Sequence, residues 1–192
     1  MIKPLKLSYN DITLEPLTMS HTQDLAQACQ DGKLWETVYT SVPSPETMTA
    51  YIDKAYHMED RIAFAVIDET TGKAIGSTSF YNIMPMVKRL EIGYTWYAKS
   101  YWRSRVNTTC KLMLMTHAFE TLGYKTIGLR TDIINKQSQR AIERLGLLKD
   151  GIIRGDRIRQ DDTITDSVVY SMTIDEWPKA KTKLLEKLAN YE

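Results

Sequence analysis

Cysteine is scarce in this sequence, and its scarcity excludes two classes of protein. The 192 residues include two cysteines, Cys29 and Cys110, which lie far apart and have no second cysteine at CxxC spacing. A disulfide framework or a zinc cluster is therefore not expected, and a reducing compartment, the cytoplasm, fits this composition. The three histidines share no ligand spacing either, so the sequence predicts no metal site.

Long hydrophobic runs and an excess of one charge are also missing. No apolar run approaches the ~20 residues of a membrane-spanning helix, and the first residues lack the apolar core of a secretory signal. Lysine and arginine number 25 against 24 aspartates and glutamates, so no overall field attracts nucleic acid or an anionic membrane. Neither a G-x-S-x-G nucleophile elbow nor a P-loop occurs. We therefore expect no membrane partner and no direct nucleic-acid binding.

The most informative stretch is a strand followed by a tight turn and a helix. Residues 91–97 are rich in β-branched and aromatic residues, which predicts a strand. From Val106 to Leu122 apolar residues recur at spacings of three and four, which predicts a helix. Ser104 or Asn107 can cap this helix. Because the first N–H groups of a helix lack internal partners and carry the positive end of its dipole, this turn is a candidate phosphate site.

The remaining chain alternates between strand and helix signals without a break, so we expect one domain over residues 1–192. Ser20 with Gln23 forms a capping-box pattern for the first helix, and Pro45 suits the first turn of the second. Further strands are expected at 11–17, 62–67, 74–81, 126–132, 147–154 and 164–172, and further helices at 20–29, 44–58, 135–145 and 173–188. This order predicts an α+β (mixed α/β) fold, with a mostly antiparallel sheet of about seven strands flanked by helices.

Several segments resemble one enzyme family when they are taken in this order. They are the hairpin FAVIDETTGKAIGS, the strand EIGY, the turn and helix from residue 102, the run NKQSQRAIERLG and the tail SVVYSMTIDEW. Together they resemble the GNAT N-acetyltransferases, in the branch similar to enzymes that acetylate ribosomal protein N-termini. The resemblance implies acetyl-CoA as co-substrate and a direct attack on it by a primary amine in a ternary complex.

The resemblance also implies where the cofactor binds. In the family a loop of pattern Q-x-x-G-x-G leads into the helix whose amides hold the pyrophosphate, and here both glycines are replaced. The matching positions run from Trp102 to Asn107, with Arg105 and Asn107 in place of the glycines. The residues expected to hold the pyrophosphate are Arg103, Ser104, Arg105, Val106, Asn107 and Thr108. Backbone groups of Thr95, Trp96 and Tyr97 would bind the pantetheine arm, and Asn135 would contact CoA. Because the glycines are lost, the alternative is a non-catalytic CoA-binding or regulatory relative.

Two residues are candidates for proton transfer, each with a structural alternative. Glu91 matches a position at the cleft and would act as base, directly or through water; the alternative is a salt bridge with Arg89 or Lys88. Alternation along the strand would place it on one face with Gly93 and Thr95. Ser138 would donate a proton to the thiolate, or else only satisfy backbone N–H groups in a first helical turn, as Asn135 would when capping that helix.

The acceptor is expected to be a protein N-terminal α-amine or a small-molecule amine. At pH 7 deprotonation costs about 1 kcal/mol for an α-amine and roughly 5 kcal/mol for a lysine-like amine, so an α-amine demands less of the protein. Trp35, Tyr39 and Tyr94 are candidates for the acceptor pocket, with packing in the core as the alternative. The protein would be a monomer or a homodimer.

Overall fold

The protein is built on one eight-stranded sheet, here described from a computed structural model that covers residues 5–191. The strand order is β1-β2-β3-β4-β5-β6-β8-β7, and every neighbouring pair is antiparallel except β5 and β6. The strands are β1 (Leu7–Tyr9), β2 (Ile12–Pro16), β3 (Ile62–Asp68), β4 (Lys73–Met84), β5 (Arg89–Tyr97), β6 (Thr126–Asp132), β7 (Leu148–Ile158) and β8 (Ile164–Thr173). The predicted mixed, mostly antiparallel sheet is confirmed, with β1 as an additional short edge strand.

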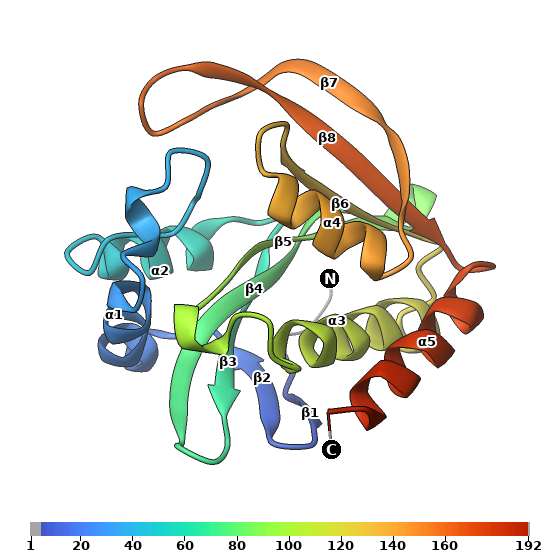
Figure 1. Ribbon diagram of the computed structural model, residues 1–192, viewed down its shortest axis with the longest axis horizontal. Coiled ribbons are helices and arrows are strands. Elements are labelled where there is room, and N and C mark those ends of the chain that lie inside the picture. The colour runs from blue at the N-terminus through green and yellow to red at the C-terminus, as the bar shows by residue number, and fades with distance from the viewer. Residues whose placement is uncertain (1–4, 192) are drawn as a thin grey trace.

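Helices cover both faces of this sheet (Figure 1). They are α1 (Thr22–Gln30), α2 (Met48–His57), α3 (Val106–Thr116), α4 (Lys136–Arg144) and α5 (Trp177–Ala189). One hydrophobic cluster joins α3 and α5 to the sheet through residues such as Phe80 and Leu114. A second cluster joins α1 and α2 to the other face around Ala65 and Trp96. Each side chain of the central strands therefore belongs either to the α3 face or to the α1–α2 face.

From the β3–β4 hairpin onward, the turns and caps use residue types that favour them. Gly72 takes a φ of +68° in the β3–β4 hairpin, and Gly146 takes +96° just after α4, conformations that glycine adopts without strain. Asn135 caps α4 by accepting a bond from the Ser138 N–H at 3.0 Å. The N–H of Thr173 donates to Glu176 at 2.7 Å before α5, as a capping box requires.

The N-terminal caps differ from the prediction. The capping box uses Thr18 and His21 rather than Ser20 and Gln23, because the chain first makes a 3-10 turn at Met19–His21. The second helix begins at Met48, later than the predicted residue 44. The Ser44 N–H there bonds to the Thr47 hydroxyl at 3.0 Å, so the hydroxyl closes a separate turn before the helix.

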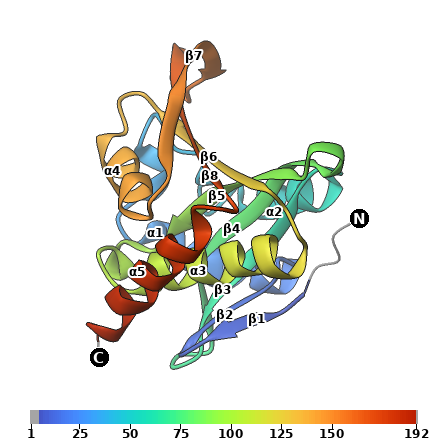
Figure 2. The ribbon, with the colours of Figure 1, turned by 90° about the vertical axis from the view of Figure 1, so that its right-hand side faces the viewer.

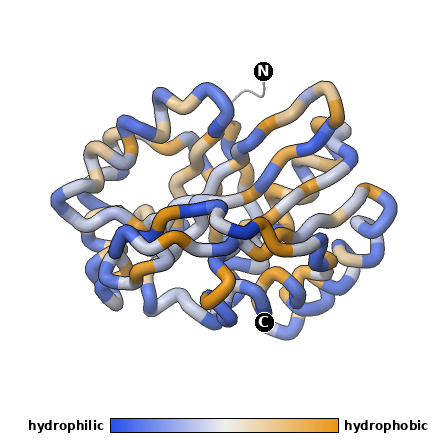
Figure 3. Tube along the Cα trace, turned by 90° about the horizontal axis from the view of Figure 1, so that it is seen from above, coloured by the Kyte–Doolittle hydropathy of each residue, from blue (hydrophilic) through white to orange (hydrophobic). Residues whose placement is uncertain are grey.

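The β7–β8 hairpin projects beyond the rest of the sheet, as both ribbon views show (Figures 1 and 2). Hydrophilic and hydrophobic segments alternate along the outer turns (Figure 3), and the β4–β5 turn exposes Met86 and Val87. Over residues 5–191, no helix combines the length and the apolar character needed to cross a membrane.

Candidate active site

The site lies where β5 and β6 separate. The two strands are paired only from Arg89 to Glu91 on β5 and from Thr126 to Gly128 on β6. Beyond these residues β5 continues to Tyr97 and β6 to Asp132 without further pairing between them. The sheet therefore contains an opening between parallel strands, with backbone groups of β5 along one edge.

A bulge in β5 decides which side chains face which helices. Ser79 of β4 pairs with Gly93, and Ser77 pairs with Trp96, so between these pairs one residue on β4 opposes two on β5. Tyr94 lies in this bulge with a φ of +50°. Glu91 and Gly93 therefore share the α1–α2 face, whereas Thr95 faces α3. The prediction that alternation keeps all three on one face is wrong, because the extra residue reverses the alternation.

Glu91 is buried at the narrow end of the opening and is fully engaged by hydrogen bonds. The hydroxyl of Tyr81 donates to it at 2.7 Å, and the amide of Asn82 donates at 2.9 Å. Arg130 of β6 adds a two-pronged ion pair, from Nε at 2.8 Å and from Nη2 at 2.5 Å. The side chain of Arg130 thus bridges the two strands where they part.

These contacts keep the Glu91 carboxylate ionised. Burial raises its pKa, but hydrogen bonds from Arg130, Tyr81 and Asn82 outweigh burial, so the pKa lies below its usual value. A carboxylate held in this way is a weak proton acceptor, which favours the salt-bridge alternative over direct proton abstraction. Its ion-pair partner is Arg130 rather than Arg89 or Lys88.

The turn before α3 has a backbone that accommodates the missing glycines. Arg105 has a φ of −67°, and Asn107 lies within the helix, so neither glycine-matching position needs the left-handed conformation. Arg103 does take it, with a φ of +61°. The Ser104 hydroxyl accepts a bond from the Val106 N–H at 3.3 Å. For the amides of Asn107 and Thr108, no hydrogen-bond partner is found within residues 5–191.

The two arginines of this turn have different surroundings. The side chain of Arg105 forms an ion pair with Asp11, just before β2. Arg103 is exposed and has no ion pair with any residue that the structure describes. Arg103 is therefore the arginine available to an anion, and Arg105 ties the turn to the sheet.

The three β5 residues expected to line the pantetheine arm point in different directions. Trp96 packs into the hydrophobic cluster of α1 and α2, and Thr95 and Tyr97 face α3. The Tyr97 hydroxyl donates to the Asn107 side chain at 3.3 Å. Their side chains mainly hold the strand in place, so a role in binding the pantetheine arm falls to their backbone groups.

Ser138 lies in the first turn of α4 with a half-buried side chain. Its N–H is used by the Asn135 cap, but no partner for its hydroxyl is found in residues 5–191. The hydroxyl is therefore free to meet a ligand, whereas the Asn135 side chain already serves the helix.

The aromatic candidates divide between core and site. Trp35 is half-buried against the α1–α2 cluster, and Tyr39 is half-buried in the loop that follows. Tyr94 stacks edge-on against Tyr81, with ring centroids 5.2 Å apart. The guanidinium of Arg61 lies 3.8 Å from the Tyr94 ring centroid. Only Tyr94 is thus joined to the polar cluster around Glu91.

Sequence reasoning missed the cationic residues of this region. The residues missed are Arg61, Arg130 and Lys111. Each contacts a side chain that is distant in the sequence, and the residues around it form no pattern that would reveal this contact. A faint signal existed for Lys111, a lysine on the predicted apolar side of a helix.

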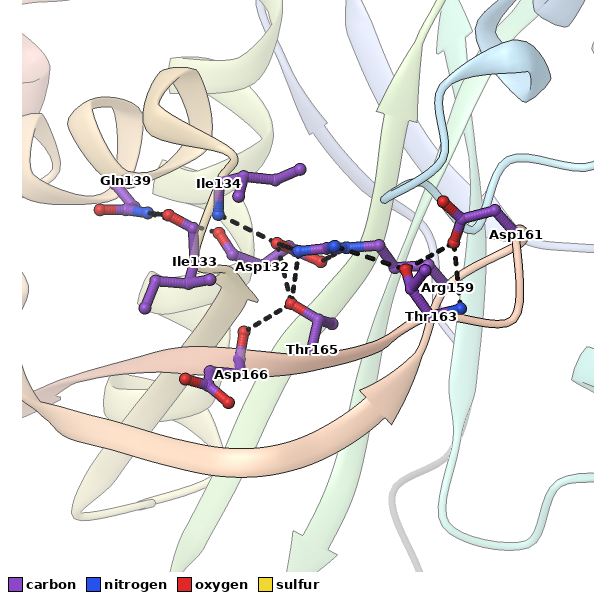
Figure 4. A network of polar contacts seen from close by, with 9 residues as sticks. All are labelled: Asp132, Ile133, Ile134, Gln139, Arg159, Asp161, Thr163, Thr165 and Asp166. Atoms are coloured by element: carbon purple, nitrogen blue, oxygen red, sulfur yellow. Dashed lines mark hydrogen bonds and ion pairs between the residues drawn. The ribbon is translucent and has the colours of Figure 1, made fainter.

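The β7–β8 hairpin is fastened to the end of β6 by a second ion pair (Figure 4). Arg159 donates from Nε and Nη2 to Asp132, both at 2.9 Å, and to the Thr165 hydroxyl at 2.6 Å. Burial raises the pKa of Asp132, but bonds from Arg159 and from the Ile134 N–H outweigh it, so the pKa is lowered. The next residue, Gln160, donates to the backbone oxygens of Val38 and Thr40. The hairpin tip therefore reaches the loop between α1 and α2.

Two buried side chains in and just after α3, Cys110 and His117, can be set aside as reactive groups on geometry. Cys110 is completely buried, and burial raises the pKa of its thiol to about 12, so it is not a nucleophile. His117 is buried and stacks on Phe80, with centroids 6.5 Å apart. Within residues 5–191, no cluster of side chains suits a metal ion.

Known proteins share both the sequence pattern and the fold. Residues 11–148 match the family described as the acetyltransferase (GNAT) domain. A curated relative, the uncharacterized N-acetyltransferase YoaA of Bacillus subtilis (strain 168), is 28% identical over 119 residues, which are 62% of this chain and 66% of that protein. The match therefore spans just under two thirds of the relative's length.

Solved structures extend the likeness over nearly the whole chain. A GCN5-related N-acetyltransferase from Brucella melitensis superimposes with a TM-score of 0.89 at 26% identity, covering 96% of this chain and 86% of that one. A RimL ribosomal L7/L12 α-N-protein acetyltransferase in complex with coenzyme A gives a TM-score of 0.75 at 18% identity, covering 89% and 99%. At that identity the second likeness concerns the fold alone.

Proposed function

The chain belongs to the acetyltransferase (GNAT) domain family, and from this premise we propose that it transfers the acetyl group of acetyl-CoA to a primary amine. The amine attacks the thioester directly in a ternary complex. The observation that carries the proposal is the opening between β5 and β6 next to the unpartnered amides at the start of α3. An extended thioester fits between separated strands, and its phosphates fit a helix N-terminus.

The residues around this opening suit acetyl-CoA. In our proposal the amides of Asn107 and Thr108, with the preceding turn and the exposed side chain of Arg103, hold the pyrophosphate. The backbone of β5 beyond the bulge binds the pantetheine arm. Bound acetyl-CoA supplies an activated acetyl group, so the protein itself needs only to orient, desolvate and move protons.

The acceptor is a protein N-terminal α-amine or a small-molecule amine, with Trp35, Tyr39 and Tyr94 on its side of the sheet. An α-amine is favoured because Glu91, engaged by Arg130, is a weak base, and an α-amine needs little help to lose its proton. In this proposal Glu91 orders a water or the amine, and the free hydroxyl of Ser138 faces the thiolate.

The proposal is tested by calorimetry with acetyl-CoA, followed by an assay for free thiol over a panel of amines that includes peptides with free N-termini. We expect binding, and thiol release that depends on the amine. Binding without release on any amine would favour the non-catalytic alternative. Absence of binding would reject both.

A further inference from the structure

Lys111 of α3 is a buried lysine without a counter-charge. Its residue is 3% exposed, and no carboxylate of the described chain lies within ion-pair distance of its ammonium group. Its one hydrogen bond goes to the hydroxyl of Thr95, at 2.8 Å. An ammonium group placed in the interior without an anion is costly, and a core position on a helix would ordinarily take an apolar residue.

The surroundings of Lys111 connect it to the cofactor opening. Thr95, its hydrogen-bond partner, is half-buried on the part of β5 that no longer pairs with β6. On α3, Lys111 follows Asn107 by four residues and Thr108 by three, so it lies one turn further along the same side of the helix. The Thr95 hydroxyl also lies 2.8 Å from the Thr78 hydroxyl of β4, so the ammonium group of Lys111 sits under β5 itself. A ligand that begins at the unpartnered amides and follows the backbone of β5 to Thr95 therefore approaches Lys111.

The titratable groups beside Lys111 do not neutralise it. Lys187 of α5, a further cation, donates to the Thr108 hydroxyl at 3.2 Å, one turn earlier on α3. The neighbours without charge are Cys110, the preceding residue, and Tyr97, which interacts with Cys110 from β5. Burial raises the pKa of both, to about 12 for Cys110, so both are uncharged near neutral pH. Burial lowers the pKa of Lys111 to about 8, so the amine is still mostly protonated at pH 7.

We propose that Lys111 supplies the positive charge that stabilises the CoA thiolate when the thioester is cleaved, a role that rests on the acetyl transfer proposed above. The amine nitrogen forms the new bond to the acetyl carbon, the carbon–sulfur bond breaks, and its electron pair remains on sulfur. The acceptor's proton leaves to solvent, and the anionic sulfur becomes the counter-charge that Lys111 lacks within the protein. A charge that appears only as the bond breaks favours the transition state over the bound substrates.

The first test needs no acceptor, because it measures the fraction of bound CoA present as thiolate near pH 7, where Lys111 still carries its charge, from the ultraviolet absorbance of the thiolate. In the wild-type complex this fraction should be about tenfold higher than in free CoA at the same pH, which corresponds to about one unit in the pKa of the thiol. Lys111→Met should restore the value of free CoA. Lys183→Met, an exposed lysine change on α5, is the matched control and should behave as wild type.

Lys111→Gln separates charge from structure, because it keeps a hydrogen-bond donor for Thr95 but carries no charge. We expect near-normal affinity for acetyl-CoA, an unshifted thiol pKa and a kcat about 100-fold lower on a verified amine. The wild-type rate should also lose a contribution above pH 8 that both Lys111 variants lack. An unshifted thiol in the wild-type complex, or the same shift in wild type and Lys111→Gln, would overturn the proposal. Failure to bind CoA at all would instead overturn the proposed function.

Discussion

Glu91 accepts hydrogen bonds from side chains on two other strands, β4 and β6. The sequence placed this carboxylate at the cleft, where the structure also has it. It could not supply the partner, because Arg130 lies 39 residues further along the chain and meets Glu91 only through parallel pairing of β5 with β6. A glutamate that acts as a base and one that forms an ion pair cannot be told apart in the sequence, because the side chains around them in the fold make the difference.

Glu91→Gln should mainly lower stability. The amide keeps the shape of the side chain but removes the charge opposite Arg130, leaving the half-buried guanidinium with Asp156 alone, at 3.6 Å, at a cost of about 3 kcal/mol. Thermal or denaturant unfolding measures this loss. If Glu91 were instead the base, turnover in the folded variant would drop by roughly 10²–10⁴-fold with little change in unfolding. Ser138→Ala, at an unpaired hydroxyl, is the comparison variant and should leave stability unchanged.

At the level of helices and strands, the sequence pattern predicted the start of α3 but not the backbone conformation of the turn before it. The change in period at Val106 located the start of the helix correctly. The loss of both glycines suggested a defective loop, yet the backbone takes the left-handed conformation only at Arg103. A consensus motif records residue types. Binding of a phosphate depends instead on the backbone conformation and on the N–H groups that are free to donate.

Ser104→Pro should abolish the rise in melting temperature that acetyl-CoA produces. Proline removes the Ser104 N–H and the hydroxyl that accepts from Val106, and it pushes the preceding residue, Arg103, out of its left-handed conformation towards the extended region. The measurement is thermal unfolding with and without acetyl-CoA, at low and high salt because contacts between charges and phosphate are screened. Arg105→Gln serves as control, since this arginine is paired with Asp11. An undiminished shift in folded Ser104→Pro would remove the turn from the site.

For the molecule as a whole, the layered fold followed from the order of strand and helix signals, because each element must bury one face. The short strand β1 gave too few residues for a pattern. The N-terminal caps were misplaced because several hydroxyls compete within a few residues, among them Thr18, Ser20 and Thr22. Tertiary contacts decide such competitions, and a local pattern does not contain them.

The free energy of unfolding should change with pH in two separate ranges, one acidic and one alkaline. Glu91 and Asp132 have lowered pKa values, so their contribution is present above about pH 4.5 and is lost as the pH falls through the native values. Lys111 acts in the opposite sense. Its pKa falls from 10.5 to about 8, so its unfavourable contribution, at most about 3 kcal/mol, is complete below pH 8 and disappears as the pH rises towards 10.5.

Unfolding of wild type and Lys111→Met over this pH range measures the change in the alkaline range. The variant should be the more stable protein at pH 7, and the difference should shrink above pH 8. Because both proteins keep the buried tyrosines, the comparison isolates the lysine. A constant difference across the range would show that Lys111 is not an uncompensated charge.

The bulge at Tyr94 determines which side chains of β5 face which layer of helices. Alternate residues along β5 face alternate layers. Before the bulge the odd-numbered residues face α1 and α2, and after it the even-numbered residues do. Pairing Tyr94 in register, without the bulge, would therefore not act locally. It would send Trp96 towards α3 and Thr95 towards the α1–α2 core, exchanging the polar and apolar linings of the strand with no change of sequence, whereas deleting Tyr94 would leave both residues on their present faces.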